Sequence, residues 1–173
     1  MSRFVDCDLL ASLTRQARGS PRGRQHLNLH DTWADPCQRT LNAILPQSYV
    51  RPHRHSLDPR SETLVAACGA LGILMFDDNG NIVQTAIIGK VEGIRATAIA
   101  VEIGPATWHS VVALTDDAVL LEVKAGPFDP ALAGEFAEWA PMEGSVAALD
   151  YLQYMRSGLG NFSSVEASTS LNR

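Results

Sequence analysis

The stretch "YVRPHRHSLDPRSETLVAACG", residues 49–69, carries two histidines, a glutamate and a glycine in close succession. Residues i and i+2 of a β-strand point to the same face of the sheet. A strand here therefore directs His53 and His55 to one side, and Arg51 with them. Imidazole and carboxylate groups suit Fe, Mn, Ni, Co and Zn. The stretch indicates either a metal cage or a surface strand that carries histidines, and the rest of the chain has to decide between them.

The remaining ligands of such a cage can be sought nearby and in a distant strand. A hairpin after His55 returns Glu62 to the histidines, and Asp58 is the alternative carboxylate. Another histidine, His109, follows a Gly104-Pro105 turn and begins an apolar run. Because a barrel brings distant strands together, we expect His109 to complete a set of three histidines and one carboxylate.

Composition limits the classes of protein that fit. The chain has 173 residues, of which 46% are apolar and 19% charged, which is enough for one domain with a packed core. A net charge of −5 argues against a nucleic-acid binder. The sequence contains no run of 18 apolar residues, so we expect no membrane span. Three cysteines without metal-site spacing are typical of free thiols in a reducing cytoplasm.

The middle of the chain predicts an all-β architecture. Seven short runs rich in β-branched residues alternate with turn sequences, which is typical of a sandwich or a small barrel. The runs cover residues 48–55, 62–68, 71–76, 81–88, 97–103, 109–115 and 118–125. Between two of them, Asn79-Gly80 favours the positive φ angles of a tight hairpin turn.

Both ends of the chain predict helices. Apolar spacing indicates a helix over 4–18. Asp35 as N-cap, Pro36 at the first position and Pro46 at the end indicate a second helix over 34–46. Helical spacing returns over 129–141 and 145–156. The predicted organisation is an N-terminal helical extension and loop (1–45), a β-barrel (46–127), a C-terminal helical extension (128–158) and a disordered tail (159–173).

The two histidine motifs resemble those of the cupin superfamily. His53, His55, Glu62 and Gly69 match its first motif, and "GPATWH" matches its second, with His109 at the end. The resemblance implies a mainly β protein, a cupin-type jelly-roll barrel with terminal helical extensions, that holds a divalent metal inside and forms a homodimer. Six residues separate His55 from Glu62, more than usual. Ala106 replaces the usual glycine, so we expect Gly104 and Pro105 to make the turn.

A closer resemblance, over about residues 15–155, is to the WbuC-type cupin metalloproteins. The strings "SYVRPHRH" and "FAEWAP" are specific to that bacterial group, which is often encoded among polysaccharide biosynthesis genes. The resemblance implies a small polar or anionic, sugar-derived ligand and establishes no reaction.

Several further side chains are candidates for the chemistry around the metal. Glu122 and Lys124 share one strand face, where they transfer protons if they point inward and form an ordinary surface pair if they point outward. Arg51 can hold a carboxylate or phosphate, or else form an edge salt bridge. The candidates for ligand binding are Arg51, Arg22, Arg24, His30 and Trp108.

Two functions from different classes fit these residues. Three histidines and one glutamate leave coordination positions open, which suits a metal-dependent isomerase, epimerase or oxygenase. The alternative is a non-catalytic module that binds a metal and a small ligand as a sensor or accessory protein. A purely structural metal is the third interpretation.

Overall fold

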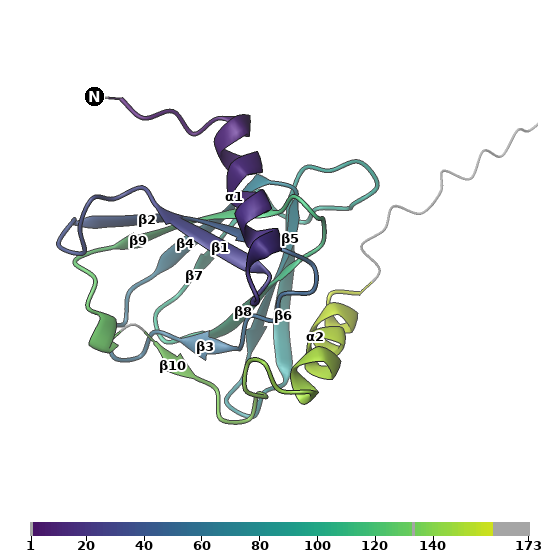
Figure 1. Ribbon diagram of the computed structural model, residues 1–173. Coiled ribbons are helices and arrows are strands. Elements are labelled where there is room, and N and C mark those ends of the chain that lie inside the picture. Colours follow the sequence, from purple (N-terminus) through teal and green to yellow (C-terminus); the bar gives the residue numbers. More distant parts are fainter. Residues whose placement is uncertain (1, 133, 161–173) are drawn as a thin grey trace, which may run out of the picture.

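Two five-stranded sheets pack face to face in the computed structural model, which describes residues 2–132 and 134–160 (Figure 1). The strands within each sheet pair antiparallel. The first sheet has the order β1 (Arg24–Asn28), β2 (Cys37–Ile44), β9 (Val119–Ala125), β4 (Glu62–Cys68) and β7 (Ala100–Ile103). The second has the order β10 (Glu135–Phe136), β3 (His53–Arg54), β8 (Trp108–Ala113), β5 (Ala70–Phe76) and β6 (Ile82–Gly89).

The facing sides of the two sheets form an apolar core. Leu64 and Ile103 of the first sheet pack with Leu71, Ile73 and Val111 of the second, and all are buried. Leu71 and Ile73 are two residues apart on β5 and both point inward, as the predicted strands require. The core fills the end of the barrel near β4, β5 and β7, which leaves room for polar side chains toward β1, β2 and β3.

Helix α1 (Cys7–Gly19) covers the outer face of the first sheet. Asp6 caps the helix by accepting a hydrogen bond from the backbone N–H of Leu9 at 2.9 Å. Its buried residues Leu10 and Leu13 pack on Leu41 and Ala43 of β2. The helix predicted over 4–18 is thus confirmed, with its start three residues later.

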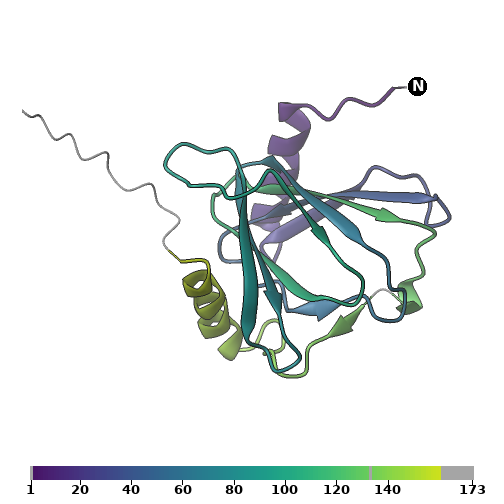
Figure 2. The same ribbon diagram turned by 180° about the vertical axis from the view of Figure 1, so that it is seen from behind.

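Helix α2 (Ala147–Gly158) lies against the second sheet, whereas α1 packs on the first (Figure 2). Leu152 and Met155 are buried against the outward residues Phe76 and Val112 of β5 and β8. The helix predicted over 145–156 is confirmed. Within the described residues, neither helix is long and apolar enough to cross a membrane. The predicted disordered tail lies, from residue 161 onward, outside the described residues.

The helix predicted over 34–46 is wrong, because this segment forms β2. Asp35 accepts a hydrogen bond from Cys37 N–H at 3.1 Å in a turn, so it caps no helix. The strand pairs with β1 on one side and β9 on the other. Leu41 and Ala43 face α1 while Thr40 and Asn42 face inward, a period of two that tertiary pairing favours over local helix signals. The first sheet therefore begins at Arg24, inside the segment assigned to an extension.

The helix predicted over 129–141 is also wrong. This segment contains a short 3-10 turn, η1 (Pro130–Leu132), and then β10, which adds an edge strand beside β3. Arg54 of β3 holds Glu135 of β10 through two hydrogen bonds of 3.0 Å, a pairing that helical spacing cannot reveal. The predicted strands are confirmed as β3 to β9, although β3 keeps only two of eight predicted residues.

The connections between strands confirm one predicted hairpin and correct another. β5 and β6 form the hairpin predicted around Asn79-Gly80, where Gly80 takes a φ of 85°. By contrast, residues 55–62 form no hairpin, because β3 belongs to the second sheet and β4 to the first. The long segment after His55 crosses between the sheets, and Glu62 therefore faces the histidines from the opposite sheet.

Candidate metal centre

Four side chains converge from both sheets inside the barrel. His53 of β3 and His109 of β8 are direct register partners in the second sheet. His55 follows immediately after β3. Glu62 is the first residue of β4 in the first sheet. The sequence places each of these residues at the end or beginning of a strand, and packing of the two sheets brings the strand ends together.

The ligand atoms of this cluster lie close enough to share one ion. One ring nitrogen from each of His53, His55 and His109 lies within 4.8 Å of the other two. Glu62 Oε1 lies 2.7 Å from His109 Nε2, and Glu62 Oε2 lies 3.4 Å from His55 Nε2. Glu62 and His109 are almost completely buried, at 3% and 2% exposure. A buried carboxylate and three imidazoles thus surround one point.

The outer nitrogens of two histidines determine what the inner nitrogens offer. His53 Nδ1 lies 3.0 Å from the carbonyl of Arg51, and His109 Nδ1 lies 2.8 Å from the carbonyl of Thr107. A carbonyl only accepts, so Nδ1 carries the proton in both rings. In the neutral ring Nε2 is then a lone-pair acceptor. Metal-binding histidines are oriented by this arrangement.

In its neutral form, His109 therefore turns an acceptor nitrogen toward the acceptor oxygen Glu62 Oε1, with no donor between them. Glu62 Oε1 is buried and makes no hydrogen bond with any described residue. Its 2.7 Å contact with His109 Nε2 is favourable only with a positive charge between the two atoms, either a proton or a metal ion. The donor set, nitrogen and carboxylate oxygen, fits a divalent transition metal.

Proton affinities inside the cluster follow from burial and from the one carboxylate. Burial lowers the pKa of His53 to about 3, with the neighbouring His109 acting in the same direction. Burial also acts to lower the pKa of His109, but the hydrogen bond that its protonated ring donates to Glu62, together with the charge of Glu62, outweighs burial and raises that pKa. Burial acts to raise the pKa of Glu62, whereas His109 and His55 lower it more strongly. His53 is thus neutral at pH 7, as a metal ligand must be.

The alternative carboxylate, Asp58, lies elsewhere. Its Oδ1 accepts an ion-pair contact from Arg60 at 2.8 Å, in the crossing segment between the sheets. Arg60 in turn donates to the carbonyls of Ala125 and Pro127. The pair therefore fastens the crossing segment to the end of β9, and the structure brings Glu62, not Asp58, to the histidines.

Arg51 lies beside the histidines and is only partly used by the protein. One guanidinium nitrogen, Nη2, donates to the carbonyl of Ala137 at 2.6 Å, and the group stacks over Phe136 at 5.5 Å. Its Nε is buried without a hydrogen-bond partner among the described residues. A cavity of about 270 Å³ joins Arg51 to His53 and His55. The structure thus brings Arg51 to the histidine side of the barrel.

Arg22 and Arg24 line the same cavity but are bound to a carboxylate of the protein. Glu143 accepts from Arg22 at 2.8 and 2.9 Å and from Arg24 at 2.8 Å. Arg24 also donates to Ser48 Oγ and to the carbonyl of Tyr49. Burial acts to raise the pKa of Glu143, but the two arginines outweigh it and lower the pKa to about 2. The pair ties β1 to the segment before α2.

His30 borders a cavity inside the barrel, whereas Trp108 lies in the core between the second sheet and α2. His30 is buried, and its Nδ1 accepts a hydrogen bond from Arg39 N–H at 3.0 Å, although its ring borders a cavity with His55. Trp108 precedes His109 on β8 and therefore points to the opposite face. It packs with Phe76 in the outer core, under the guanidinium of Arg54 at 4.2 Å. The structure does not bring Trp108 to the histidine cluster.

Glu122 and Lys124 point into the barrel. Lys124 is buried at 9% exposure, and Glu122 borders the space around His53, Glu62 and His109. Burial raises the pKa of Glu122 to about 7, helped by the negative charge of Glu62. Burial also lowers the pKa of Lys124. Neither side chain forms an ion pair or hydrogen bond within the described part of the chain.

Sequence reasoning missed the polar residues of β2. Thr40 and Asn42, together with Asn28 of β1, line the cavity that also borders His55 and Glu122. Interpreting 34–46 as a helix hid them, because helical spacing places Thr40 and Asn42 on different faces. The alternation of polar and apolar residues over 40–43 was the signal that could have found them.

Comparisons with known proteins agree with this architecture. A family model described as "Domain of unknown function (DUF6016)" matches residues 5–88. No curated protein matches the sequence. Among solved structures, protein SO0799 from Shewanella oneidensis is similar with a TM-score of 0.53 and 14% identity, over 85% of this chain and 90% of that chain.

Two further solved structures have the same fold. CapF, crystallised with the inhibitor 3-isopropenyl-tropolone, has a TM-score of 0.52 and 20% identity, over 65% of this chain and 31% of that one. Rru_A2000 from Rhodospirillum rubrum, described as a cupin-2 domain, has a TM-score of 0.50 and 14% identity, over 83% of this chain and 84% of that one. The two facing sheets, their order and these similarities show that this chain has the cupin fold.

Proposed function

We propose that this protein is a cupin metalloprotein that binds a divalent transition metal through His53, His55, Glu62 and His109. The observation that carries the proposal is the 2.7 Å approach of the buried Glu62 Oε1 to the Nε2 of neutral His109, beside a ring nitrogen of each of the other two histidines. Nδ1–H donation to backbone carbonyls leaves the Nε2 lone pairs of His53 and His109 for the space that both residues share with Glu62. A bound metal cation removes the repulsion between these acceptor atoms and leaves His109 unprotonated.

The donor set is compatible with Fe, Zn, Ni, Mn or Co. A metal held by three histidines and one carboxylate supplies a Lewis acid with positions open to a further ligand. The cavity of about 270 Å³ beside Arg51 gives a small molecule access to this centre. Arg51, fixed on one side by Ala137 and Phe136, supplies a cation for a carboxylate or phosphate.

The ligand in this proposal is a small polar or anionic, sugar-derived molecule. The similarity of "SYVRPHRH" and "FAEWAP" to the WbuC-type proteins supports this class and a role in bacterial polysaccharide-related metabolism. The same similarity supports a homodimer, and the three free cysteines support a cytoplasmic location. These finer assignments are part of the proposal.

An enzyme is favoured over a non-catalytic binding module by one observation. Glu122 faces the centre from β9 with no ion pair or hydrogen bond to any described residue, and its pKa lies near 7. A carboxyl group of this kind suits proton transfer to or from a bound ligand. Isomerisation, epimerisation and oxygenation are the candidate reactions. A sensor or accessory protein needs no such group and remains the second candidate.

Metal analysis of tag-free protein tests the proposal directly. We expect about one transition-metal ion per chain in the wild type by mass spectrometry. His53→Ala and His109→Ala should each lose most of it. His26→Ala is the matched control, because His26 lies exposed on β1 outside the cluster and should leave the metal content unchanged.

The outcome separates the candidate functions. Full metal occupancy in both His53→Ala and His109→Ala would show that the cluster is not the metal site. Turnover of sugar acids or keto sugars by the metal-loaded wild type, lost in Glu122→Gln with metal retained, supports the enzyme. Metal binding together with ligand binding but without turnover supports the binding module.

A further inference from the structure

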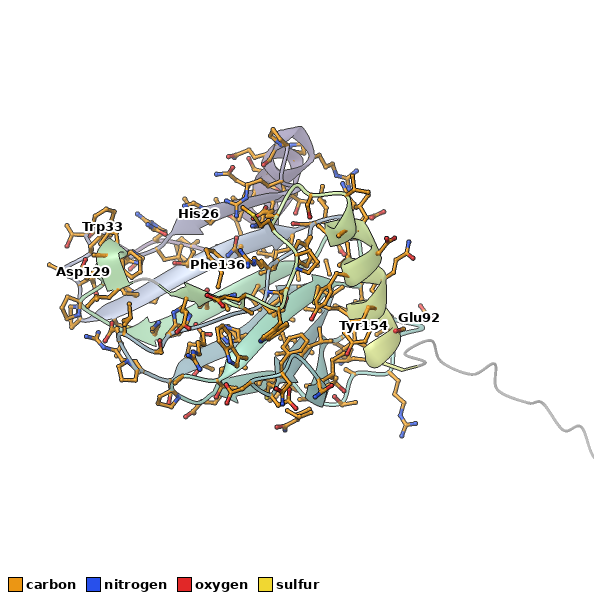
Figure 3. The ribbon with its side chains drawn as sticks, turned by 90° about the horizontal axis from the view of Figure 1, so that it is seen from below. His26, Trp33, Glu92, Asp129, Phe136 and Tyr154 are labelled. Carbon is orange, nitrogen blue, oxygen red and sulfur yellow. The ribbon has the colours of Figure 1, made fainter. Side chains whose placement is uncertain are left out.

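A second cavity, of about 320 Å³, opens from the histidine centre toward β1 and β2. His55 and Glu122 border it on the inner side, and Asn42 and Glu122 also border the space around His53, Glu62 and His109. Trp33 lies at the outer end. Figure 3, which views the molecule from below, shows Trp33 and His26 on the side of β1, with Phe136 nearer the middle. The cavity thus connects the outside to the histidines by a route different from that beside Arg51.

The wall of this cavity is polar where a barrel interior is ordinarily apolar. Cross-strand register places Asn28 beside Thr40 and Thr40 beside Glu122, and likewise His26 beside Asn42. On the same inner face of the sheet, β4 and β7 carry Leu64 and Ile103 instead. His26 and Asn28 are exposed and Thr40 and Asn42 are half-buried, so water can reach these groups in the empty cavity. A ligand that enters the cavity has to replace the hydrogen bonds of that water.

Some of these polar residues already serve the fold. Gln38 donates to the carbonyls of Trp33 and Asp35, and His30 accepts from Arg39 N–H. These two side chains hold the loop between β1 and β2. They are structural, and they offer little to a ligand.

Others have capacity left for a ligand. Thr40 donates to Asn28 Oδ1 at 3.3 Å, which leaves the two amide hydrogens of Asn28 without a partner. The side chains of Asn42 and His26 make no hydrogen bond within residues 2–132 and 134–160. Amide, hydroxyl and imidazole groups all both donate and accept. They therefore complement hydroxyl groups, which do the same, better than they complement anions.

An aromatic pair completes the outer end. Trp33 and Phe128 meet edge to face with ring centroids 5.9 Å apart, and Trp33 is 55% exposed. An exposed indole beside neutral amides offers an apolar face to C–H groups and hydrogen bonds to O–H groups. The volume lies at the lower end of the range for small-molecule sites, which matches one monosaccharide unit.

We propose that this cavity binds the hydroxylated, uncharged part of the ligand, through Asn28, Thr40 and Asn42, while the metal and Arg51 hold its acidic part. The inference rests on the proposed metal function and narrows its ligand to a single sugar acid or sugar phosphate unit. The hydroxylated chain lies along β2, away from Arg51. Thr40 and Asn42 then distinguish a polyhydroxylated acid from a fatty acid of equal length.

Calorimetric titration of the metal-loaded protein tests the inference with two probes. D-gluconate and hexanoate share a carboxylate and a six-carbon chain and differ in their hydroxyl groups. We expect gluconate to bind wild type at least roughly tenfold more tightly than hexanoate. Asn42→Leu and Thr40→Val should each bring the two affinities together, chiefly by weakening gluconate, with metal content unchanged.

Thr63→Val is the matched control, because Thr63 lies on β4 next to Glu62 and faces the other side of the same sheet. It should keep the gluconate preference. A preference that survives Asn42→Leu and Thr40→Val would mean that the metal alone holds the hydroxyl groups, and the inference is then wrong. A gluconate affinity no higher than that of hexanoate in wild type overturns it as well.

A separate measurement distinguishes failure of this inference from failure of the metal proposal. If wild type holds no metal, saturation-transfer NMR with the neutral polyol sorbitol still reports on the cavity. A sorbitol signal that Asn42→Leu abolishes and Thr63→Val retains supports the hydroxyl site without the metal. In this metal-free case the metal proposal has already failed, and absence of any sorbitol signal overturns the hydroxyl site as well.

Discussion

Two clusters border the same cavity of the barrel, and each contains a carboxylate that is at least partly buried. One consists of Arg22, Arg24 and Glu143, and the other of His53, His55, Glu62 and His109. In the first, two guanidinium groups donate to Glu143 at 2.8 to 2.9 Å, so donors and acceptors match within the chain. In the second, Glu62 Oε1 meets His109 Nε2, which is an acceptor in the neutral ring. A cluster that is complete by itself holds the fold together, whereas an incomplete one is built for something that the chain lacks.

The same substitution in the two clusters should have opposite effects on stability. Glu62→Gln places amide hydrogens next to His109 Nε2, which can accept one of them. We expect it to stabilise the metal-free protein by about 1 kcal/mol and to weaken metal binding at least ~100-fold, or about 2.7 kcal/mol. Chemical denaturation of chelator-treated protein and metal competition assays measure the two effects.

Glu143→Gln provides the contrast. It removes the charge that pairs with Arg22 and Arg24, and we expect a loss of roughly 1 kcal/mol of unfolding free energy, since Glu143 is 30% exposed and Arg22 is mostly exposed. Metal affinity should not change. If Glu62→Gln destabilised the metal-free protein as Glu143→Gln does, both clusters would be structural and the comparison would fail.

Glu122 borders the incomplete cluster, and its titration should make the stability of the protein depend on pH. Its pKa is raised from 4.5 in the unfolded chain to about 7 by burial and by Glu62. The folded protein therefore binds the extra proton between these values, and its stability falls as the pH rises from 4.5 through 7. Glu122→Gln should abolish this pH dependence. In metal-free protein at pH 8, we expect its free energy of unfolding to exceed that of wild type by an amount on the order of 2 kcal/mol.

The control for this change is Glu138→Gln, because Glu138 is exposed and forms no ion pair among the described residues. Denaturant unfolding at pH 5 and at pH 8 measures both variants. At pH 5 the two variants should resemble wild type, and only Glu122→Gln should gain at pH 8. Equal behaviour of Glu122→Gln and wild type at both pH values would show that Glu122 titrates normally and is well solvated.

The sequence reveals the two kinds of cluster unequally. Histidine spacing over 53–55 and the run after Gly104 suffice to predict which residues meet, because strand geometry fixes where i and i+2 point. The Glu143 cluster joins residues 121 positions apart through the packing of a C-terminal segment on β1, which no local pattern encodes. Arg22 and Arg24 were therefore expected at a ligand and lie on Glu143 instead.

Fold prediction from sequence worked where local and tertiary preferences agree. β4 to β9 combine β-branched residues with the right turns, and these strands were predicted with small errors at their ends. Asp35, Pro36 and Pro46 imitate helix start and stop signals around β2, and pairing with β1 and β9 overrides them. The error had a functional consequence, because it concealed the inward side chains of Thr40 and Asn42.

Ala106 lies in the loop before His109, and its substitution should have the smallest effect on stability. Where cupins carry glycine in this motif, the expectation was that Gly104 and Pro105 would make the turn, but Ala106 itself adopts the left-handed conformation, with a φ of 57°. An L-residue other than glycine pays about 1 kcal/mol there. Strained backbone of this kind is typical of functional sites, and among the described residues no non-glycine residue of the Glu143 cluster has a positive φ.

Ala106→Gly should therefore raise the free energy of unfolding by about 0.5 to 1 kcal/mol in denaturant titrations, with the metal content preserved because His109 keeps its Nδ1 contact with Thr107. Ala96→Gly, at an exposed loop position without a positive φ, is the matched change and should lower stability slightly, since glycine gives the unfolded chain more freedom. Opposite signs for the two variants locate the strain at Ala106. Equal losses would show that the loop is relaxed and that the position of His109 costs the fold nothing.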